Sequence, residues 1–210
     1  MTRIRERIGA DRDAVGALVV AAAIPFVFLH ERYQPDLSVA AGSTSVDIRL
    51  SDVAVLAVVI AAVVAAARSG LGRLGAGRIV WVPGALLLAW LGVELLRPAS
   101  IDDTLFADHV VSFAKFCEYA LLAIAVPLLV RRAQDLAIVL GAFVLWGAIA
   151  TAVALVQFFG VDTLGAWRAG WRQPSFLGHH DFAGLSAVAT SLALACIVAT
   201  RARTPAARLF

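Results

Sequence analysis

The segment richest in groups that could do chemistry is 160–181, GVDTLGAWRAGWRQPSFLGHHD. Trp167 and Trp171 are four residues apart, and so are Arg168 and Arg172. In a short helix, this spacing would put the two indoles on one face and the two guanidiniums on the adjacent face. Such a helix could lie among lipid headgroups as an aromatic belt. Alternatively, it could bind an anionic lipid-linked substrate, because the planar guanidinium grips phosphate oxygens with two hydrogen bonds and stays charged.

Two histidines and an acid follow at once, as His179, His180 and Asp181. These residue types can bind metal, but ligands from one chain usually have a wider spacing, and no cysteine or His-Glu-x-x-His arrangement lies nearby. We therefore expect no metal here. Asp181 is expected to cap the last helix, because a carboxylate at a helix N-terminus accepts from free N–H groups. The histidines are expected to hydrogen-bond to substrate or to loop carbonyls.

A second set of polar residues lies within or at the ends of apolar runs. Lys115 and Glu118 are three residues apart and can pair on one helix face. Asp52, Glu94 and Gln157 lie near the ends of other runs. Charges inside membrane spans are costly, so these groups should face the bundle interior. They form either structural ion pairs and caps or a polar cavity open to the outside, in which Lys115 would bind substrate.

The elements that carry these residues are predicted to be membrane helices. The 210 residues are 61% hydrophobic and 16% charged, whereas soluble domains are about half apolar and a quarter charged. Two cysteines are too few for a disulfide scaffold. About six apolar runs are long enough, or nearly so, to cross a bilayer as helices; they lie near 14–30, 52–67, 79–96, 110–130, 136–159 and 182–200. The predicted fold is an all-α polytopic membrane helix bundle.

The arginines predict the orientation of the bundle. With a cytoplasmic N-terminus, twelve of the 18 Lys and Arg residues fall in inner segments and five in outer ones, with Lys115 inside a span. Both termini are therefore predicted to be cytoplasmic, in a multi-pass protein of the cytoplasmic (inner) membrane whose active side faces outward. The pI of about 9.4 reflects these clusters. Because no basic stripe is interleaved with aromatics, nucleic acid is not an expected partner.

The junction between loop 160–181 and the last helix, WRQPSFLGHHDFAGLS, resembles the signature of the O-antigen ligase and O-antigen polymerase family. In that family an arginine precedes a G-T-F-x-N-P-N-like stretch and a helix that opens with small residues. Arg172 matches the arginine, Ser175-Phe176 the Thr-Phe, and Ala183-Gly184 the small pair. An early Leu-Ser-Asp phrase of the family is matched by 50–52.

The chain also departs from this signature. Pro174 replaces the glycine, and Gly178-His179-His180 stands where the family has Asn-Pro-Asn. The later outer loop of the family, with a second essential arginine and a histidine, is missing from these residues. We therefore expect 1–210 to be a single transmembrane domain and the N-terminal portion of a longer protein. On its own it would be inactive.

The resemblance implies glycan transfer on the outer face of the membrane, from a polyprenyl-diphosphate carrier to a hydroxyl on another glycan or a lipid. It implies neither a metal nor a nucleotide sugar as cofactor. Arg172 is the candidate catalytic residue, since a preorganised guanidinium would stabilise the charge on the leaving diphosphate by ~3 kcal/mol. The candidate substrate-binding residues are Arg168, Trp171, His179, His180 and Lys115. A transporter or flippase half for a lipid-linked or anionic solute, or a non-catalytic membrane scaffold, would account for many of the same features.

Overall fold

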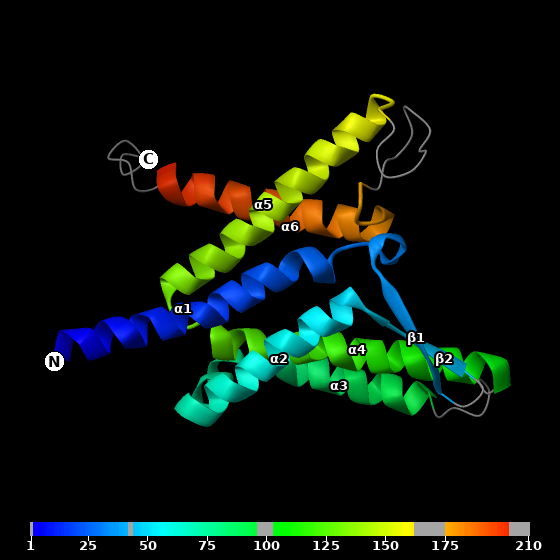
Figure 1. The fold of residues 1–210 in the computed structure, drawn as a ribbon, viewed down its shortest axis with the longest axis horizontal. Coiled ribbons are helices and arrows are strands. Elements are labelled where there is room, and N and C mark those ends of the chain that lie inside the picture. Colours follow the sequence, from blue (N-terminus) through cyan, green and yellow to red (C-terminus); the bar gives the residue numbers. More distant parts are fainter. Residues whose placement is uncertain (1, 42–43, 96–102, 162–174, 202–210) are drawn as a thin grey trace.

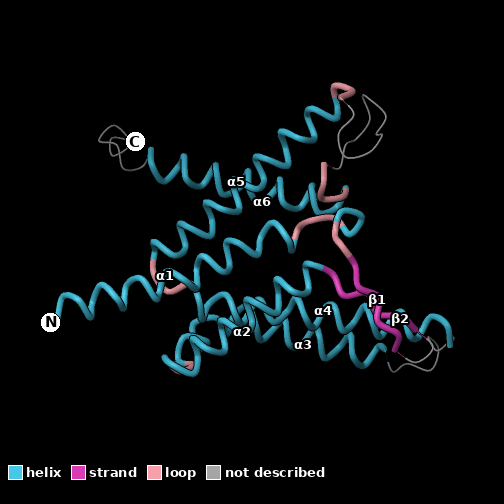
Figure 2. The backbone as a smooth tube through the Cα atoms, in the orientation of Figure 1, coloured by secondary structure: helices cyan, strands magenta, loops and turns pink. Residues whose placement is uncertain are grey.

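The computed structural model describes residues 2–41, 44–95, 103–161 and 175–201 (Figure 1). The described part is mostly helical, as predicted, and Figure 2 shows helix and strand along the chain. Its helices and strands are α1 (Thr2–Val27), η1 (Glu31–Tyr33), β1 (Asp36–Ala41), β2 (Thr44–Arg49), α2 (Leu50–Ser69), η2 (Gly72–Gly77), α3 (Arg78–Leu95), α4 (Asp103–Leu129), α5 (Ala133–Phe158) and α6 (His179–Arg201).

Successive long helices run back and forth between two ends of the molecule (Figure 1). The start of α1, η2, the link between α4 and α5, and the last turn of α6 lie at one end, here called the arginine-rich end. The strands β1 and β2, the last turn of α5 and the start of α6 lie at the other, here called the hairpin end. The connections between the long helices therefore alternate between these two ends.

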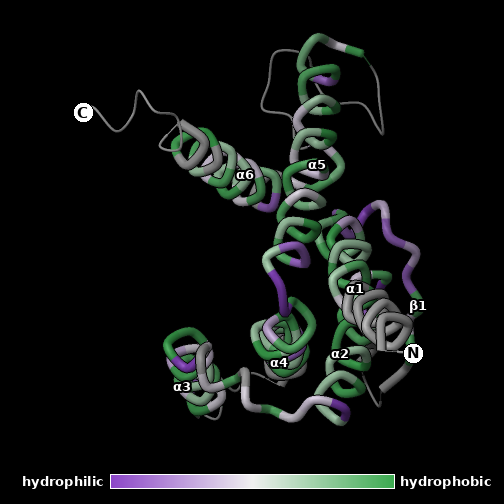
Figure 3. Tube along the Cα trace, turned by 90° about the vertical axis from the view of Figure 1, so that its left-hand side faces the viewer, coloured by the Kyte–Doolittle hydropathy of each residue, from purple (hydrophilic) through white to green (hydrophobic). Residues whose placement is uncertain are grey.

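Four of the described helices are long and apolar enough to cross a membrane: Leu50–Ser69, Arg78–Leu95, His109–Leu129 and Ala133–Phe158. Figure 3 shows hydrophobic residues along these helices and hydrophilic ones gathered mainly at the connections. The first and last predicted runs correspond to shorter described apolar stretches, Val15–Val27 and Asp181–Ala195. The structure thus supports a helical membrane protein, with four of the six predicted runs meeting the length and hydropathy of a span.

A small β-hairpin, which the sequence reasoning did not predict, lies between α1 and α2. β1 and β2 pair antiparallel, with Leu37 opposite Ile48 and Ser38 opposite Asp47. Side chains alternate between the faces of a strand, so the hairpin has one apolar face and one polar face. The second predicted run, 52–67, corresponds to α2, which begins at Leu50, while Ile48 pairs in β2.

Two apolar clusters hold the helices together. The first joins α1, α2 and α4 through Val20, Ala23, Ala54, Val58, Ala62, Ala125, Leu128 and Leu129. The second joins the end of α1 to α5 and α6 around Ala150, Phe176, Leu177 and Leu185. Within the first, Gly16 lets α1 approach α4 closely, because a Cβ there would lie 3.1 Å from Leu129 Cδ2. α1 and the residues that follow it therefore take part in both clusters.

Candidate functional site

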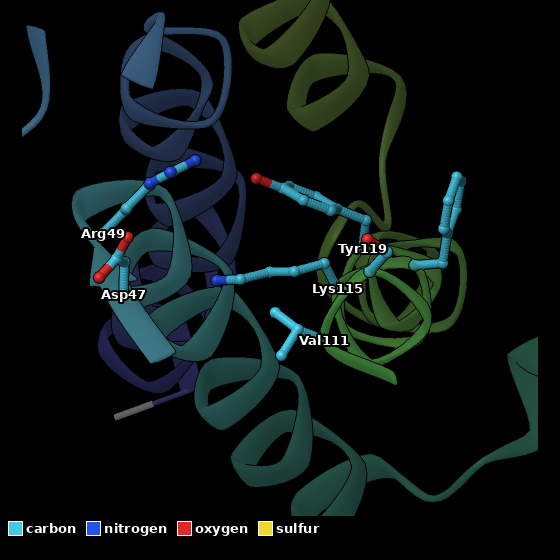
Figure 4. Close-up of a pocket in the computed structure, with 7 residues that line it drawn as sticks. Asp47, Arg49, Val111, Lys115 and Tyr119 are labelled. Atoms are coloured by element: carbon cyan, nitrogen blue, oxygen red, sulfur yellow. The ribbon is translucent and has the colours of Figure 1, made fainter. Parts of the chain in front are cut away.

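An open cleft of about 660 Å³ lies between the hairpin and α4 (Figure 4). Asp47 and Arg49 of the hairpin line one side. Figure 4 shows Lys115 and Tyr119 extending from α4 toward them. The described residues that line the cleft are Asp47, Arg49, Val111, Ser112, Lys115, Phe116 and Tyr119. The cleft thus combines ionic and hydroxyl groups with an apolar and aromatic wall.

Lys115 lies in an ion cluster beside this cleft. Its Nζ contacts Asp52 Oδ2 across the α2–α4 packing and lies 3.6 Å from Glu118 Oε2 on its own helix. The pairing of Lys115 with Glu118 confirms the spacing argument; the contribution of Asp52 from α2 was not foreseen. Two carboxylates oppose one ammonium, so Lys115 offers the cleft hydrogen-bond donors rather than an unopposed positive charge.

Asp52 also defines the start of α2. Its Oδ2 accepts a hydrogen bond of 2.8 Å from the Arg49 N–H. A carboxylate in this position satisfies one of the N–H groups that a helix leaves free at its N-terminus. The same oxygen contacts Lys115, so the cap of α2 is tied directly to α4.

The hairpin side chains of the cleft are held by their own partners. Asp47 Oδ1 accepts a hydrogen bond of 2.6 Å from Ser38 Oγ on the opposite strand. Arg49 Nη1 lies 2.6 Å from Glu31 Oε2. Both cleft residues are therefore restrained while they remain partly open to a ligand.

Gln34 closes the base of the hairpin. Its buried side chain accepts a 2.9 Å hydrogen bond from the Ser51 N–H through Oε1, and its Nε2 donates to the Leu29 carbonyl. One amide thus joins the end of α1 to the start of α2. This fixes the direction in which the hairpin leaves the helices.

The described part of the family-like motif is a buried turn, Ser175–Gly178. Phe176 stacks at 4.8 Å and 48° on Trp146 of α5, and Leu177 is fully buried. Ser175 and Gly178 have φ of 58° and 80°. Gly178 is required at its position, because a Cβ there would overlap the imidazole of His30. The turn is therefore packed into the bundle rather than standing free in a loop.

His30 and its neighbour Glu31 connect this turn to the cleft. The His30 N–H donates to the Phe176 carbonyl at 3.0 Å, and Glu31 forms the ion pair with Arg49. His30 Nδ1 accepts from the Arg32 N–H at 3.1 Å, which orients the imidazole. The motif turn and the cleft are thus joined through two consecutive residues.

The predicted site residues are only partly described. Arg168, Trp171 and Arg172 lie outside the described residues, and so do the side chains of His179 and His180. Lys115 lines the cleft. Asp181 was predicted to cap the last helix; α6 instead begins at His179, which places Asp181 within its first turn. There its charge is favourable to the helix dipole.

Sequence reasoning missed the role of the hairpin in the site. Asp47 and Arg49 are two residues apart, the spacing that puts side chains on one face of a strand. The alternation of polar and apolar residues in 36–49 could have predicted this shared face, if a strand had been considered in place of a loop. Their approach to Lys115 depends on how the hairpin packs, which no local pattern indicates.

The chemistry offered by the cleft is that of a hydrogen-bonding site with an apolar wall. Asp47 supplies acceptor oxygens, while Arg49, Ser112, Lys115 and Tyr119 supply donors. Such a set suits a ligand with many hydroxyl groups beside an apolar part. Among the described side chains, no three of His, Cys, Asp or Glu gather closely enough to hold a metal ion.

Comparison with protein-family models, with curated proteins and with solved structures returned no match to this chain.

Proposed function

We propose that this chain is the transmembrane part of a glycan ligase or polymerase. It would transfer a glycan from a polyprenyl-diphosphate carrier to a hydroxyl on a glycan or lipid acceptor, at the outer face of the cytoplasmic membrane. The proposal rests on the family-like motif and on one structural observation. The motif turn bonds to His30, and the next residue, Glu31, bonds to Arg49 of the cleft.

The two parts would handle different portions of the substrates. The cleft has donors and acceptors for sugar hydroxyls, and its aromatic side chains Phe116 and Tyr119 offer apolar surface to a sugar ring or a lipid chain. Its opposed charges suit a neutral hydroxylated group better than a diphosphate. The cleft is therefore assigned to the glycan.

Arg172 is assigned to the diphosphate, with Arg168 as its helper. Arg172 precedes Ser175 by three positions, so its Cα can lie no more than about 11 Å from the Cα of Ser175 in the buried turn. A guanidinium there would stabilise charge as the bond between the sugar and the diphosphate breaks. Trp171, His179 and His180 would complete the contacts to substrate.

The test is Arg172→Lys in the full-length protein. Lysine keeps the charge but loses the planar fork, so glycan transfer should fall by about a hundredfold or more, with normal abundance in the membrane. Arg78→Lys, an exposed arginine at the arginine-rich end, is the matched control and should transfer normally. Unchanged transfer by Arg172→Lys would remove this residue from the catalytic role.

The cleft is tested separately with Asp47→Asn. Loss of the carboxylate should raise the KM for the glycan several-fold, while the protein remains abundant and correctly inserted. Asp36→Asn is the control, because Asp36 is an exposed carboxylate of the same hairpin that does not line the cleft. Equal effects of the two variants would argue against a glycan site between the hairpin and α4.

The proposed orientation places the hairpin end outside the cell and both termini in the cytoplasm. In a variant without its native cysteines, a cysteine at Gly170 should react with an impermeant thiol reagent applied to intact cells. A cysteine at Gly75 in η2 should react only after the membrane is opened. The reverse pattern would overturn the orientation and with it the outward-facing site.

A transporter half for a lipid-linked or anionic solute is the second candidate function. The Asp52–Lys115–Glu118 cluster favours it, because ionisable groups that join two candidate spans often mark the path of a substrate or ion. Proteoliposomes holding the full-length protein separate the two functions. Lipid-linked glycan that changes leaflet, with loss in Lys115→Met and no glycan transfer, would favour transport.

A further inference from the structure

A second hollow lies at the arginine-rich end, far along the helices from the cleft. It is a groove of about 420 Å³ among α1, α2 and the end of α4, a volume within the usual range of about 300–1,000 Å³ for ligand sites. Val15, Ala61, Val64 and Leu129 contribute apolar walls. The groove therefore has room for an apolar chain between helices.

The charged end of the groove is formed by Arg68 and Arg131. Arg131 is held in place by three hydrogen bonds. Its Nε donates to the Leu128 carbonyl at 2.9 Å, its Nη1 to Ser69 Oγ at 2.6 Å, and its Nη2 to the Ala65 carbonyl at 3.2 Å. These bonds satisfy groups at the C-terminal ends of α2 and α4, where the helix dipoles are negative. Arg131 thus offsets that negative potential at a fixed position.

The guanidinium of Arg68 supplies the positive charge that can pair with a ligand. Arg68 is exposed in the last turn of α2, and within the described residues its side chain has neither a hydrogen bond nor an ion pair. Among the described side chains, the groove lining contains two guanidiniums and no carboxylate. Its electrostatic character is therefore cationic, in contrast to the mixed charges of the cleft.

The groove has a direction that suits an amphiphile. Ala61, Val64 and Arg68 follow one another at spacings of three and four residues, so they lie along one face of α2. The apolar residues lie toward the middle of the helix and the arginine at its end. A free phosphate would use only the charged end, whereas a phospholipid would use the whole length.

We propose that this groove binds an anionic glycerophospholipid. Its phosphate would pair with Arg68, backed by Arg131, and one acyl chain would follow the Val64–Ala61 face of α2. Guanidiniums suit this role because they bind phosphate oxygens with directed, charge-assisted hydrogen bonds. Basic pockets between helices near a membrane surface are suited to phospholipid head groups. This lipid site is separate from the proposed glycan site and does not rest on it.

The test is a titration of the purified full-length protein in a non-ionic detergent. Dioctanoyl phosphatidylglycerol, dioctanoyl phosphatidylcholine and inorganic phosphate are the three probes, and bound lipid is counted by native mass spectrometry. Phosphatidylglycerol should bind at one site, more tightly than phosphatidylcholine. Arg68→Gln should weaken it about fivefold, the effect of one cation near a membrane surface. Val64→Phe, which fills the groove without changing charge, should also weaken binding.

Arg78→Gln is the matched control, because Arg78 is exposed at the same end but does not line the groove. It should bind phosphatidylglycerol as the unmodified protein does. Equal affinity for both lipids, or an equal loss in Arg78→Gln and Arg68→Gln, would overturn the proposal. Displacement of the lipid by inorganic phosphate at comparable concentration would also overturn it, since this would show an anion site without a lipid-specific groove. Folding of each variant is checked by its thermal unfolding curve.

Discussion

Replacing Gly178 by alanine tests the contact between the motif turn and the end of α1. Gly178 has φ of 80°, a conformation that costs an alanine about 1–2 kcal/mol. The new Cβ would also overlap the His30 imidazole. The ring must then move, which weakens the hydrogen bond from the His30 N–H to the Phe176 carbonyl by about 1 kcal/mol. The expected loss is about 2–3 kcal/mol of unfolding free energy.

The matched control is Gly184→Ala in α6. A Cβ at Gly184 meets nothing within 4 Å, and alanine is the better helix former, so this change should stabilise by about 0.5–1 kcal/mol. The assay is thermal unfolding in detergent, followed by tryptophan fluorescence. Gly178→Ala should lower Tm by roughly 5–10 °C for a chain of this size. If both alanine variants unfold at the same temperature, the turn is not packed against His30 and the link to the cleft is wrong.

Two further changes probe the polar groups around the cleft. Lys115→Met should destabilise the protein by about 1–3 kcal/mol, because Asp52 and Glu118 lose the cation between them. Adding Glu118→Gln should recover part of that loss in the same unfolding assay, and a variant as stable as the original protein would contradict the ion cluster. Gln34→Leu should cost about 2 kcal/mol or more, since the Ser51 N–H loses its buried acceptor. Faster hydrogen exchange at the Ser51 amide would report that loss directly, and unchanged exchange would refute it.

The helices could be predicted from the sequence because long apolar runs leave few other structures in a membrane. The residues at which the helices begin and end could not be predicted in this way. The run predicted from residue 110 belongs to a helix that begins at Asp103, and the run predicted from residue 14 to one that begins at Thr2. Hydropathy marks the apolar length of a helix, whereas hydrogen bonding continues through polar residues that are good helix formers. The predicted and observed boundaries therefore differ mainly at the polar ends.

The candidate site was predictable only where it depends on local spacing. The spacing of three positions from Lys115 to Glu118 is enough to predict a pair on one helix. Asp52 also contacts Lys115, although it lies 63 positions earlier in the sequence. Predicting this contact requires knowing how α2 packs on α4. The hairpin was missed because its strands have only six residues each. Strand periodicity over so short a stretch is easily taken for a connecting loop.

The short segment from Leu29 to Gln34 has a consequence for any ligand that reaches the cleft. Its backbone and side chains contact the motif turn, the hairpin and the start of α2. A ligand that draws Arg49 away from Glu31 would alter the same few residues that anchor Phe176. Occupancy of the cleft and the position of the turn would then be thermodynamically linked, and each would change the other by the same free energy. A protein with two substrates would benefit from such reciprocity, because the binding of each substrate would then influence whether the other reaches its reactive position.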